Sequence, residues 1–452
     1  MNRSFSLSVA VAVVLSCFTQ TLSATSHSTL LPNGLQVDTL ANYLQLSDDT
    51  ASVYIYHGIP YAHAARFRTP ELVDGIEPAD DYIHAPVTCY QRLNISRPDI
   101  QYGESHVVVE DSTLSPLTEN CLVLTVNSPY PLNDTNTAQL PVLVYIHGGN
   151  YYAGGGEKAN TQLAELALQE RVVTVSVTYR LGVFGYLYQP DSNSVNIGLQ
   201  DQLTALRWVY DNIRLFGGDA HNITLAGQSA GAQSVVYCLA DTSRVPIRRA
   251  VVFSAPMGLT TGKAIAKQRT NYIRQYLHQR NQDAWTCPAD SLLAAQLNYM
   301  DTHPQQWHAL PFSPTDLPQM PRYGNRVQWP EQVIVTAQAQ DGSMFGPQLT
   351  WGLVTRNVFT RPAQRYVHYL QQQGVNAQYH LFTWQPRGSQ LQAAHCAELP
   401  LLLDGVEDYW VGSWIMGDVT ADELRAMRRV AMQDFAQFMR TGDWTMQPNY
   451  SR

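Results

Sequence analysis

The stretch that most constrains the fold is residues 224–237, which read TLAGQSAGAQSVVY. A short apolar run, residues 223–226, is followed by Gly-Gln-Ser-Ala-Gly and then by residues with a helical pattern. This order predicts a strand, a sharp turn and a helix, the context of a nucleophile elbow. Such a turn strains the backbone of its serine, so glycines are needed two residues before and two after it. Gly227 and Gly231 meet that need, and Ser229 is the candidate nucleophile; a plain glycine-rich turn is the alternative for this pattern alone.

The composition is that of a folded globular protein. Of 452 residues, 45% are hydrophobic and only 15% are charged, so the chain can bury a large core and leaves little room for disordered tails. The net charge is −8 and there is no basic patch. Nucleic acid is therefore excluded as an expected partner.

The first residues predict an export signal. Residues 1–24 begin with Arg3, continue through the apolar run 5–18 and end in Leu-Ser-Ala, a small-residue cleavage site. Cleavage leaves residues 25–452 as a single domain, secreted or periplasmic. Serines dilute the short apolar run, which disfavours a membrane anchor, and lipid attachment at Cys17 is a further alternative. No other segment has the roughly 20 apolar residues needed to cross a bilayer.

An oxidising compartment would allow cysteines to pair. Leaving out the one in the signal, the cysteines number five, so at least one has no partner within the chain. They are Cys89, Cys121, Cys238, Cys287 and Cys396.

The middle of the chain alternates apolar runs with helical patterns. Continuous apolar runs predict strands buried on both faces of a sheet, and helices between them predict a mainly parallel α/β sheet covered on both sides. Residues 31–56 predict an antiparallel meander, and residues 258–307 predict polar-faced helices above the sheet. The predicted strands are 122–126, 142–146, 172–177, 223–226, 250–253, 333–337 and 378–382, and the predicted helices are 160–170, 199–216 and 421–440.

A serine hydroxyl needs a base, and the base needs a third group that holds its tautomer. The order serine, acid, histidine is the one expected of an α/β-hydrolase. The candidate acid is Asp341 and the candidate base is His395, each in a loop that follows a predicted strand. Both therefore lie at the carboxyl edge of the predicted sheet, where open α/β folds bind ligands. A turn aspartate and a core or surface histidine are the alternatives for each residue alone.

Attack on an ester creates an oxyanion that needs preset N–H donors. Residues 146–151 read IHGGNY after a predicted strand, the type of loop that supplies them. The N–H of Ala230, at the start of the helix after Ser229, is a further expected donor. A phosphate-binding or plain glycine turn is the alternative, but no Lys-Ser/Thr follows, which excludes a Walker loop.

Together with these motifs, the chain resembles the type-B carboxylesterase/cholinesterase family over residues 53–443. Further matching motifs occur in the family's order. They are GIPYA at 58–62, Cys89 with Gln91, ENCL at 119–122, YIHGG at 145–149, YRLG at 179–182, FGYL at 184–187, NIGLQDQ at 196–202, ALRWV at 205–209, DNI at 211–213 and FGGD at 216–219.

The resemblance implies an α/β-hydrolase fold and a triad of Ser229, His395 and Asp341. It also implies an oxyanion hole formed by the N–H groups of Gly149, Asn150 and Ala230, and a disulfide between Cys89 and Cys121. The implied reaction acylates the serine with a carboxylic ester, releases the alcohol and hydrolyses the acyl-enzyme. The expected partner is a small or medium uncharged ester, with no cofactor and no metal.

Several residues depart from the family pattern. Gln228 stands where the family usually has Glu before the serine, so a charge that would favour a cationic substrate is missing. Asp341 replaces the usual Glu, and Asn150 replaces a third glycine, a substitution suited to a positive φ. No tryptophan lies between Cys89 and Cys121, which argues against a choline ester. Cys396 replaces the glycine that commonly follows the histidine and is expected to be a small buried thiol.

The chain is also a short member of the family. The missing stretches follow Ser254 and lie between Phe345 and Asn357, which predicts a reduced helical cap and an open pocket. For each aromatic candidate, a place in the core is an equal alternative. The candidate pocket residues are Gln228, Tyr151, Tyr152, Phe312, Phe345 and Trp351.

Three other functions use overlapping features. A catalytically inactive cholinesterase-like binding or adhesion protein is the alternative from another class, although such relatives typically lack a triad member. A lipase would need an apolar lid, for which the chain has little material, and a thioesterase or amidase would use the same residues. The sequence leaves open the natural substrate, the oligomeric state and the pairing of Cys238, Cys287 and Cys396.

Overall fold

The computed structural model describes most of the chain from residue 23 onward. The described residues are 23–30, 36–45, 52–74, 86–91, 116–134, 139–157, 162–189, 196–241, 245–303, 310, 312–315, 317, 330–404 and 410–446. Within them, every helix is too short or too polar to cross a bilayer. The predicted signal, residues 1–24, lies outside this part except for Ser23 and Ala24.

One sheet of ten strands runs through the molecule in the order β1-β2-β3-β8-β10-β9-β11-β12-β13-β14. The strands from β10 to β14 in this order are parallel to one another, whereas β1, β2, β3 and β8 pair antiparallel. The bounds are β1 Ser23–Leu30, β2 Gln36–Gln45, β3 Ser52–Pro60, β8 Val123–Ser128, β9 Leu140–Ile146, β10 Val173–Val177, β11 Gly218–Gln228, β12 Ile247–Phe253, β13 Gln332–Gln338 and β14 Asn376–Phe382.

Two short sheets lie beside the main one. In the first, β4 (Ala62–His63) pairs with β5 (Glu71–Leu72). In the second, β6 (Thr88–Cys89) pairs with β7 (Leu117–Thr118), although residues 90–116 separate them along the chain. The second sheet joins the start and the end of the segment predicted to be closed by a disulfide.

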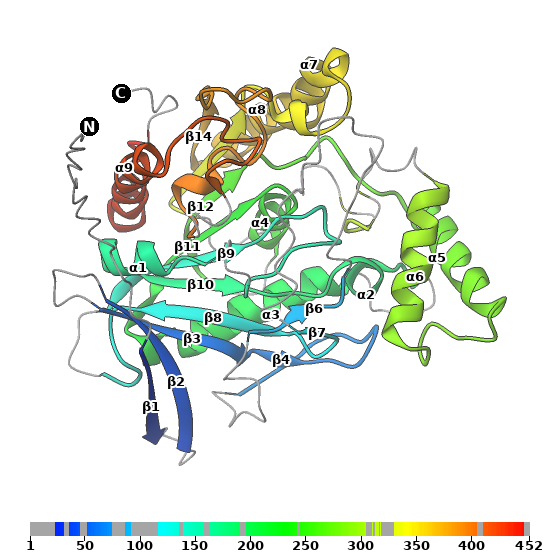
Figure 1. Cartoon of the computed structure of the whole chain (residues 1–452), viewed down its shortest axis with the longest axis horizontal. Coiled ribbons are helices and arrows are strands. Elements are labelled where there is room, and N and C mark those ends of the chain that lie inside the picture. The colour runs from blue at the N-terminus through cyan, green and yellow to red at the C-terminus, as the bar shows by residue number, and fades with distance from the viewer. Residues whose placement is uncertain are drawn as a thin grey trace, which may run out of the picture.

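Helices cover both faces of the main sheet, and α5 and α6 lie at one end of the molecule, away from α9 (Figure 1). The bounds are α1 Ala164–Glu170, α2 Gly182–Tyr186, α3 Ile197–Asn212, α4 Ala230–Ala240, α5 Lys263–His278, α6 Ala289–Thr302, α7 Trp351–Val354, α8 Arg361–Gln372 and α9 Ala421–Thr441. Short 3₁₀ helices span Ile213–Phe216, Asp341–Met344, Gln348–Thr350 and Leu399–Leu401, and a π-helix spans Thr355–Thr360.

The alternation of side chains along β9 shows how the two faces are used. Val144 and its second neighbours belong to one buried cluster together with residues of α3, α4 and α8. Leu143 and Tyr145 belong to the other cluster, with residues of α1 and α9. Successive side chains of a strand point to opposite faces, so an uninterrupted apolar run is the pattern of a strand covered on both sides. This arrangement confirms the predicted fold class.

Three differences from the sequence expectations have physical reasons. The meander begins at Ser23 rather than residue 31. The sequence did not predict β1 because this strand reads SATSHSTL and carries no apolar alternation. Helix α8 was not predicted; Pro362 lies in its first turn, where a proline is tolerated. The predicted helix 199–216 ends instead at Asn212 and continues as a 3₁₀ turn, which Gly217 closes at φ 76°.

Candidate active site

The turn after β11 holds Ser229 in the conformation expected of an elbow. β11 ends at Gln228 and α4 begins at Ala230, so Ser229 alone connects strand to helix, with φ 57° and ψ −123°. Its N–H donates to the carbonyl oxygen of Phe253 at 2.9 Å, and its own carbonyl accepts from the N–H of Gln233 at 2.9 Å. A non-glycine residue with positive φ is sparsely populated and persists only where surrounding contacts enforce it.

The two glycines that flank the serine are required by close backbone contacts. A Cβ on Gly231 would lie 2.0 Å from the carbonyl oxygen of Ile146, and one on Gly227 would lie 2.6 Å from the backbone of Gly231. Both distances are far below van der Waals contact. The start of α4 therefore packs directly against the end of β9.

His395 and Asp341 form a buried pair next to Gln228, the last residue of β11. The Nδ1 of His395 lies 2.6 Å from Oδ1 of Asp341, and both side chains are almost completely buried. The other oxygen, Oδ2, accepts from the N–H of Gln338 at 2.7 Å and from Oγ of Ser254 at 3.2 Å. These contacts fix the carboxylate as an acceptor for a proton on Nδ1, and in that tautomer the lone pair of the imidazole lies on Nε2.

Gln228 lies against that second nitrogen. Its Nε2 is 3.2 Å from Nε2 of His395 and 3.2 Å from Sγ of Cys396. With the Nδ1 proton on the Asp341 side, the amide donates to the lone pair of Nε2. Burial raises the pKa of the Cys396 thiol well above its usual value, followed by the effect of nearby carboxyl groups. The sequence predicted a buried thiol at this position, but the Cys396 residue is only partly buried.

A second carboxyl group, Glu398, lies close to Asp341 and Gln228, and sequence reasoning missed it. It is completely buried, and its Oε2 accepts from Nε2 of Gln338 at 2.6 Å. Burial, and then the charge of Asp341, raise its pKa from 4.5 to about 8. The available signal was its position three residues after His395, in a short helical turn next to Leu399–Leu401.

The loop after β9 lies against the elbow. Three successive residues have positive φ: Gly149 at 102°, Asn150 at 55° and Tyr151 at 63°. The value at Asn150 explains why asparagine can stand where the family has glycine. Gly148 is close enough to the serine that an added Cβ would lie 3.1 Å from Cβ of Ser229. The loop thus brings its backbone beside the serine.

Of the candidate aromatic residues, Phe345 contacts the histidine, whereas the others are buried in the protein core. Phe345 packs edge-on against His395 with ring centroids 5.1 Å apart. Phe359, which sequence reasoning missed, lies at the same distance from His395. Tyr151 is fully buried and its hydroxyl donates to Gln233 at 3.1 Å.

The remaining candidates are core residues by burial. Phe312 is fully buried and packs against Tyr299 and Arg269 of the α5–α6 pair. Tyr152 is 8% exposed and Trp351 is 6% exposed. For these residues, the core alternative describes the side-chain environment.

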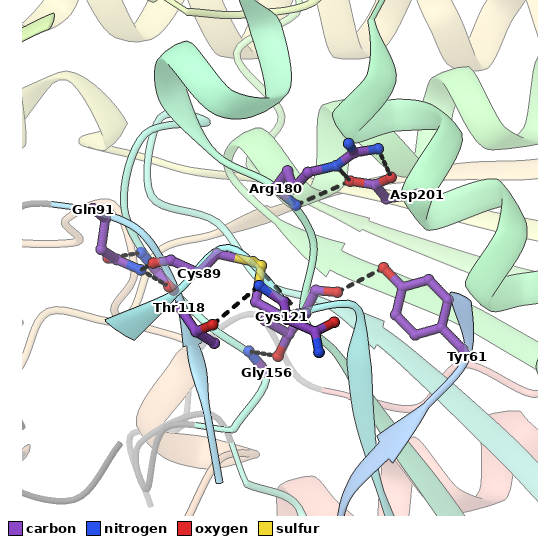
Figure 2. Close-up of a disulfide and its surroundings, with 11 residues drawn as sticks. Tyr61, Cys89, Gln91, Thr118, Cys121, Gly156, Arg180 and Asp201 are labelled. Atoms are coloured by element: carbon purple, nitrogen blue, oxygen red, sulfur yellow. Dashed lines mark hydrogen bonds and ion pairs between the residues drawn. A yellow bond between two sulfur atoms is a disulfide. The ribbon is translucent and has the colours of Figure 1, made fainter. Parts of the chain in front are cut away.

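The cysteines follow the implied pattern in part. Cys89 and Cys121 form a disulfide, with Cα atoms 5.0 Å apart (Figure 2). Cys287 and Cys396 are free thiols, and Cys238 is buried within α4. Arg66, which makes a bidentate ion pair with Glu119, also donates to the carbonyl oxygen of Cys287 at 2.7 Å.

The strand order, and the position of the elbow between β11 and α4, make the chain an α/β-hydrolase. The carboxylesterase family profile matches residues 41–348, more than half of the chain. The chain belongs to this family of carboxylic ester hydrolases.

Individual relatives agree with this assignment. Over 428 residues the chain is 30% identical to a protein of Rhodococcus erythropolis described as a probable N-octanoylanthranilate hydrolase, an alignment that covers 87% of this chain and 90% of that one. Over 195 residues it is 37% identical to the para-nitrobenzyl esterase of Bacillus subtilis, covering 42% of this chain and 37% of the relative. A solved PNB esterase superposes with a TM-score of 0.71 at 24% identity, over 93% of this chain and 92% of that chain, which shows the shared fold.

Proposed function

We propose that the protein is a serine carboxylesterase in which Ser229 is the nucleophile, His395 the general base and acid, and Asp341 the group that orients the histidine. The observation that carries this proposal is the 2.6 Å contact of Nδ1 of His395 with the buried Asp341 carboxylate, next to the strained elbow. A fixed base beside a strained serine is the arrangement that activates a hydroxyl for acyl transfer.

In the acylation step, Oγ of Ser229 attacks the ester carbonyl carbon while its proton moves to Nε2 of His395. Asp341 stabilises the imidazolium that forms. The N–H groups of Gly149, Asn150 and Ala230 are proposed to bind the oxyanion, each donor contributing about 3 kcal/mol in the transition state. The histidine then protonates the departing alcohol, and a water activated by the same base hydrolyses the acyl-enzyme.

Gln228 must respond as the proton moves. Its amide N–H donates to Nε2 of His395 in the resting arrangement, 3.2 Å away. Once Nε2 carries a proton it can no longer accept a hydrogen bond, so the amide must turn or withdraw. Because Gln228 is neutral, the substrate class that it favours is an uncharged ester, small or medium in size.

The Rhodococcus relative suggests a second kind of substrate. Its name denotes an octanoyl group on the nitrogen of an aromatic acid. A triad that hydrolyses esters also hydrolyses suitably held amides, since both reactions pass through a tetrahedral oxyanion. An N-acylated aromatic amine with a medium acyl chain is therefore a candidate beside the esters. Export through residues 1–24, either into the periplasm or out of the cell, belongs to the same proposal.

The direct test is labelling by an organophosphate ester, read by intact mass and peptide mapping. One phosphoryl group on Ser229 is expected, and Ser229→Ala should abolish both labelling and turnover of a p-nitrophenyl ester. Ser291→Ala, on α6, serves as the matched control and should behave as the parent protein. An unlabelled protein under conditions that label a control hydrolase would instead favour the inactive binding protein.

A second experiment separates the substrate classes. Acetyl, butyryl and octanoyl p-nitrophenyl esters are compared with N-octanoylanthranilate by kcat/KM. An open pocket predicts that octanoyl is accepted as well as acetyl; a sharp preference for acetyl would contradict it. Measurable turnover of N-octanoylanthranilate would extend the function to amides.

A further inference from the structure

The side chain of Gln91 holds the backbone of the loop that follows β9. Its Nε2 donates to the carbonyl oxygen of Gly154 at 2.5 Å, and its Oε1 accepts from the N–H of the same residue at 2.8 Å. Gln91 is 1% exposed. A buried primary amide that satisfies both polar groups of one residue fixes the position and the rotation of that peptide.

Gly154 contacts the part of the loop that lies beside the serine. A Cβ on Gly154 would lie 2.3 Å from Nδ1 of His147 and 2.7 Å from the carbonyl oxygen of Gly148. The two segments are therefore packed backbone against backbone. Gly148 in turn lies against Ser229, so a continuous line of contacts leads from Gln91 to the nucleophile.

The amide nitrogen of Gln91 also binds the backbone of a disulfide-bonded cysteine. Its Nε2 also donates to the carbonyl oxygen of Cys89 at 3.1 Å. Figure 2 shows Gln91 beside the bond from Cys89 to Cys121. Cys121 lies just before β8, a buried strand of the main sheet. The disulfide thus anchors the backbone from which Gln91 reaches the loop.

The loop needs such an external support. Gly149, Asn150 and Tyr151 all have positive φ, and two of them are not glycine. Residues in this region persist only where the surroundings over-determine them. A tether outside the loop lowers the cost of keeping its N–H groups aimed at one point before the substrate arrives.

We propose that Gln91 is a positioning residue for the oxyanion loop, and that the Cys89–Cys121 disulfide acts on catalysis through it. This inference rests on the proposed function, because it assigns the loop to the binding of an oxyanion. Gln91 does not touch the substrate. Its loss should weaken binding of the transition state while leaving binding of the ground-state ester largely intact.

The first test compares Gln91→Met, which keeps size and removes the hydrogen bonds, with Tyr90→Phe. Tyr90 is the neighbour whose hydroxyl donates to Asp290 on α6 at 2.8 Å, away from the loop. For Gln91→Met, kcat on a p-nitrophenyl ester should fall by about tenfold or more, with KM changed by less than about twofold. Affinity for a trifluoromethyl ketone, whose adduct carries the oxyanion, should fall in parallel. Tyr90→Phe should change neither.

A second variant guards against misfolding. Gln91→Asn keeps an amide but shortens its reach, so the polar groups can still hydrogen bond while Gly154 loses its partner. It should show the same fall in kcat, with an unchanged circular dichroism spectrum. An unchanged kcat and ketone affinity in either folded variant would overturn the proposal.

The disulfide arm tests the coupling. Cys89→Ala with Cys121→Ala should lower kcat by a similar factor, and adding Gln91→Met should lower it little further, because both changes release the same contact. Fully additive effects would mean that the disulfide does not act through Gln91.

Organophosphate labelling of Ser229 is measured on every variant at completion. Labelling in all variants with an unchanged kcat sinks this inference alone. Failure to label the parent protein sinks the proposed function first.

Discussion

The elbow and the loop that follows β9 are in contact at Gly148 and Ser229, yet they are held in different ways. The elbow is fixed by its own backbone: β11 is paired on both sides, and the glycines at 227 and 231 let β9 and α4 approach closely. The loop leaves the end of β9 and is held by side chains from distant parts of the chain. Gln91 holds Gly154, and Thr178 accepts from the N–H of Gly156 at 3.0 Å.

This difference predicts how substitutions in the elbow and in the supports of the loop affect folding and turnover. A change within the elbow disturbs close-packed backbone, which cannot relax without moving the sheet. A change at a side chain that holds the loop, such as Gln91, leaves the sheet intact and loosens only the backbone N–H groups of the loop. The first kind should reduce both folding and activity, and the second should act mainly on turnover.

The largest effect on turnover is expected from Gly231→Ala. Its Cβ would lie 2.0 Å from the carbonyl oxygen of Ile146, so the start of α4 must move away from β9. We expect a loss of about 3 kcal/mol in the free energy of unfolding and a fall of about 100-fold or more in kcat/KM. Urea unfolding and ester hydrolysis measure the two effects.

Gly352→Ala on α7 is the matched control, because a Cβ there meets nothing within 4 Å. It should leave stability and kcat/KM near those of the parent protein. An active, stable Gly231→Ala variant would show that the elbow can relax and would remove the contrast with the loop.

The next effect concerns stability, at the buried ion pair of Arg180 and Asp201. It is buried and bidentate, with Nη2 to Oδ1 at 2.6 Å and Nε to Oδ2 at 2.8 Å (Figure 2). The preceding residue, Tyr179, donates from its hydroxyl to the carbonyl oxygen of His147 at 2.8 Å. Asp201→Asn leaves Arg180 buried without its counter-charge and should cost about 3–5 kcal/mol.

The control lies on the same helix. Asp211→Asn breaks the exposed pair with Arg207 on α3 and should cost no more than about 0.5 kcal/mol. Replacing both buried partners, Arg180→Met with Asp201→Leu, should recover much of the loss, although the N–H of Arg180 also loses its acceptor. Equal costs for the buried and exposed pairs would show that the stability contributed by the Arg180–Asp201 pair does not depend on its burial.

The parts of the structure that the sequence predicts follow the same division between local and distant contacts. The sheet and the elbow were predictable because their signals are local: apolar runs for the strands, and glycines two residues from Ser229. The acid and the histidine were predicted from chain order, and the structure brings them to 2.6 Å. The contact of Gln91 with Gly154 joins residues 63 apart, and neither residue type nor spacing reveals such a pair. Phe359 was not predicted for the same reason, because its contact with His395 also joins residues far apart in the sequence.

Glu398 depends both on a residue that is near in the sequence and on residues that are distant from it. It is near His395 in sequence, but its environment comes from β13, where Gln338 donates to it, and from Asp341 and Gln228. The pKa of this carboxyl is raised from 4.5 to about 8 by burial first and by Asp341 next. A carboxyl kept neutral beside the ionised partner of the histidine avoids a second buried negative charge.

The last of the three effects is a pH dependence of stability. Between the two pKa values, the folded protein keeps the proton on Glu398 whereas the unfolded chain has lost it. The free energy of unfolding should fall as pH rises through this window, by up to about 1.4 kcal/mol per pH unit for one proton. Glu398→Gln keeps an acceptor for Gln338 and cannot ionise, so it should remove this slope. Asp422→Asn, at an exposed carboxylate on α9, should retain it. Urea unfolding from pH 5 to 8 measures the slopes; parallel curves for Glu398→Gln and the parent protein would mean that Glu398 is ionised in the folded state.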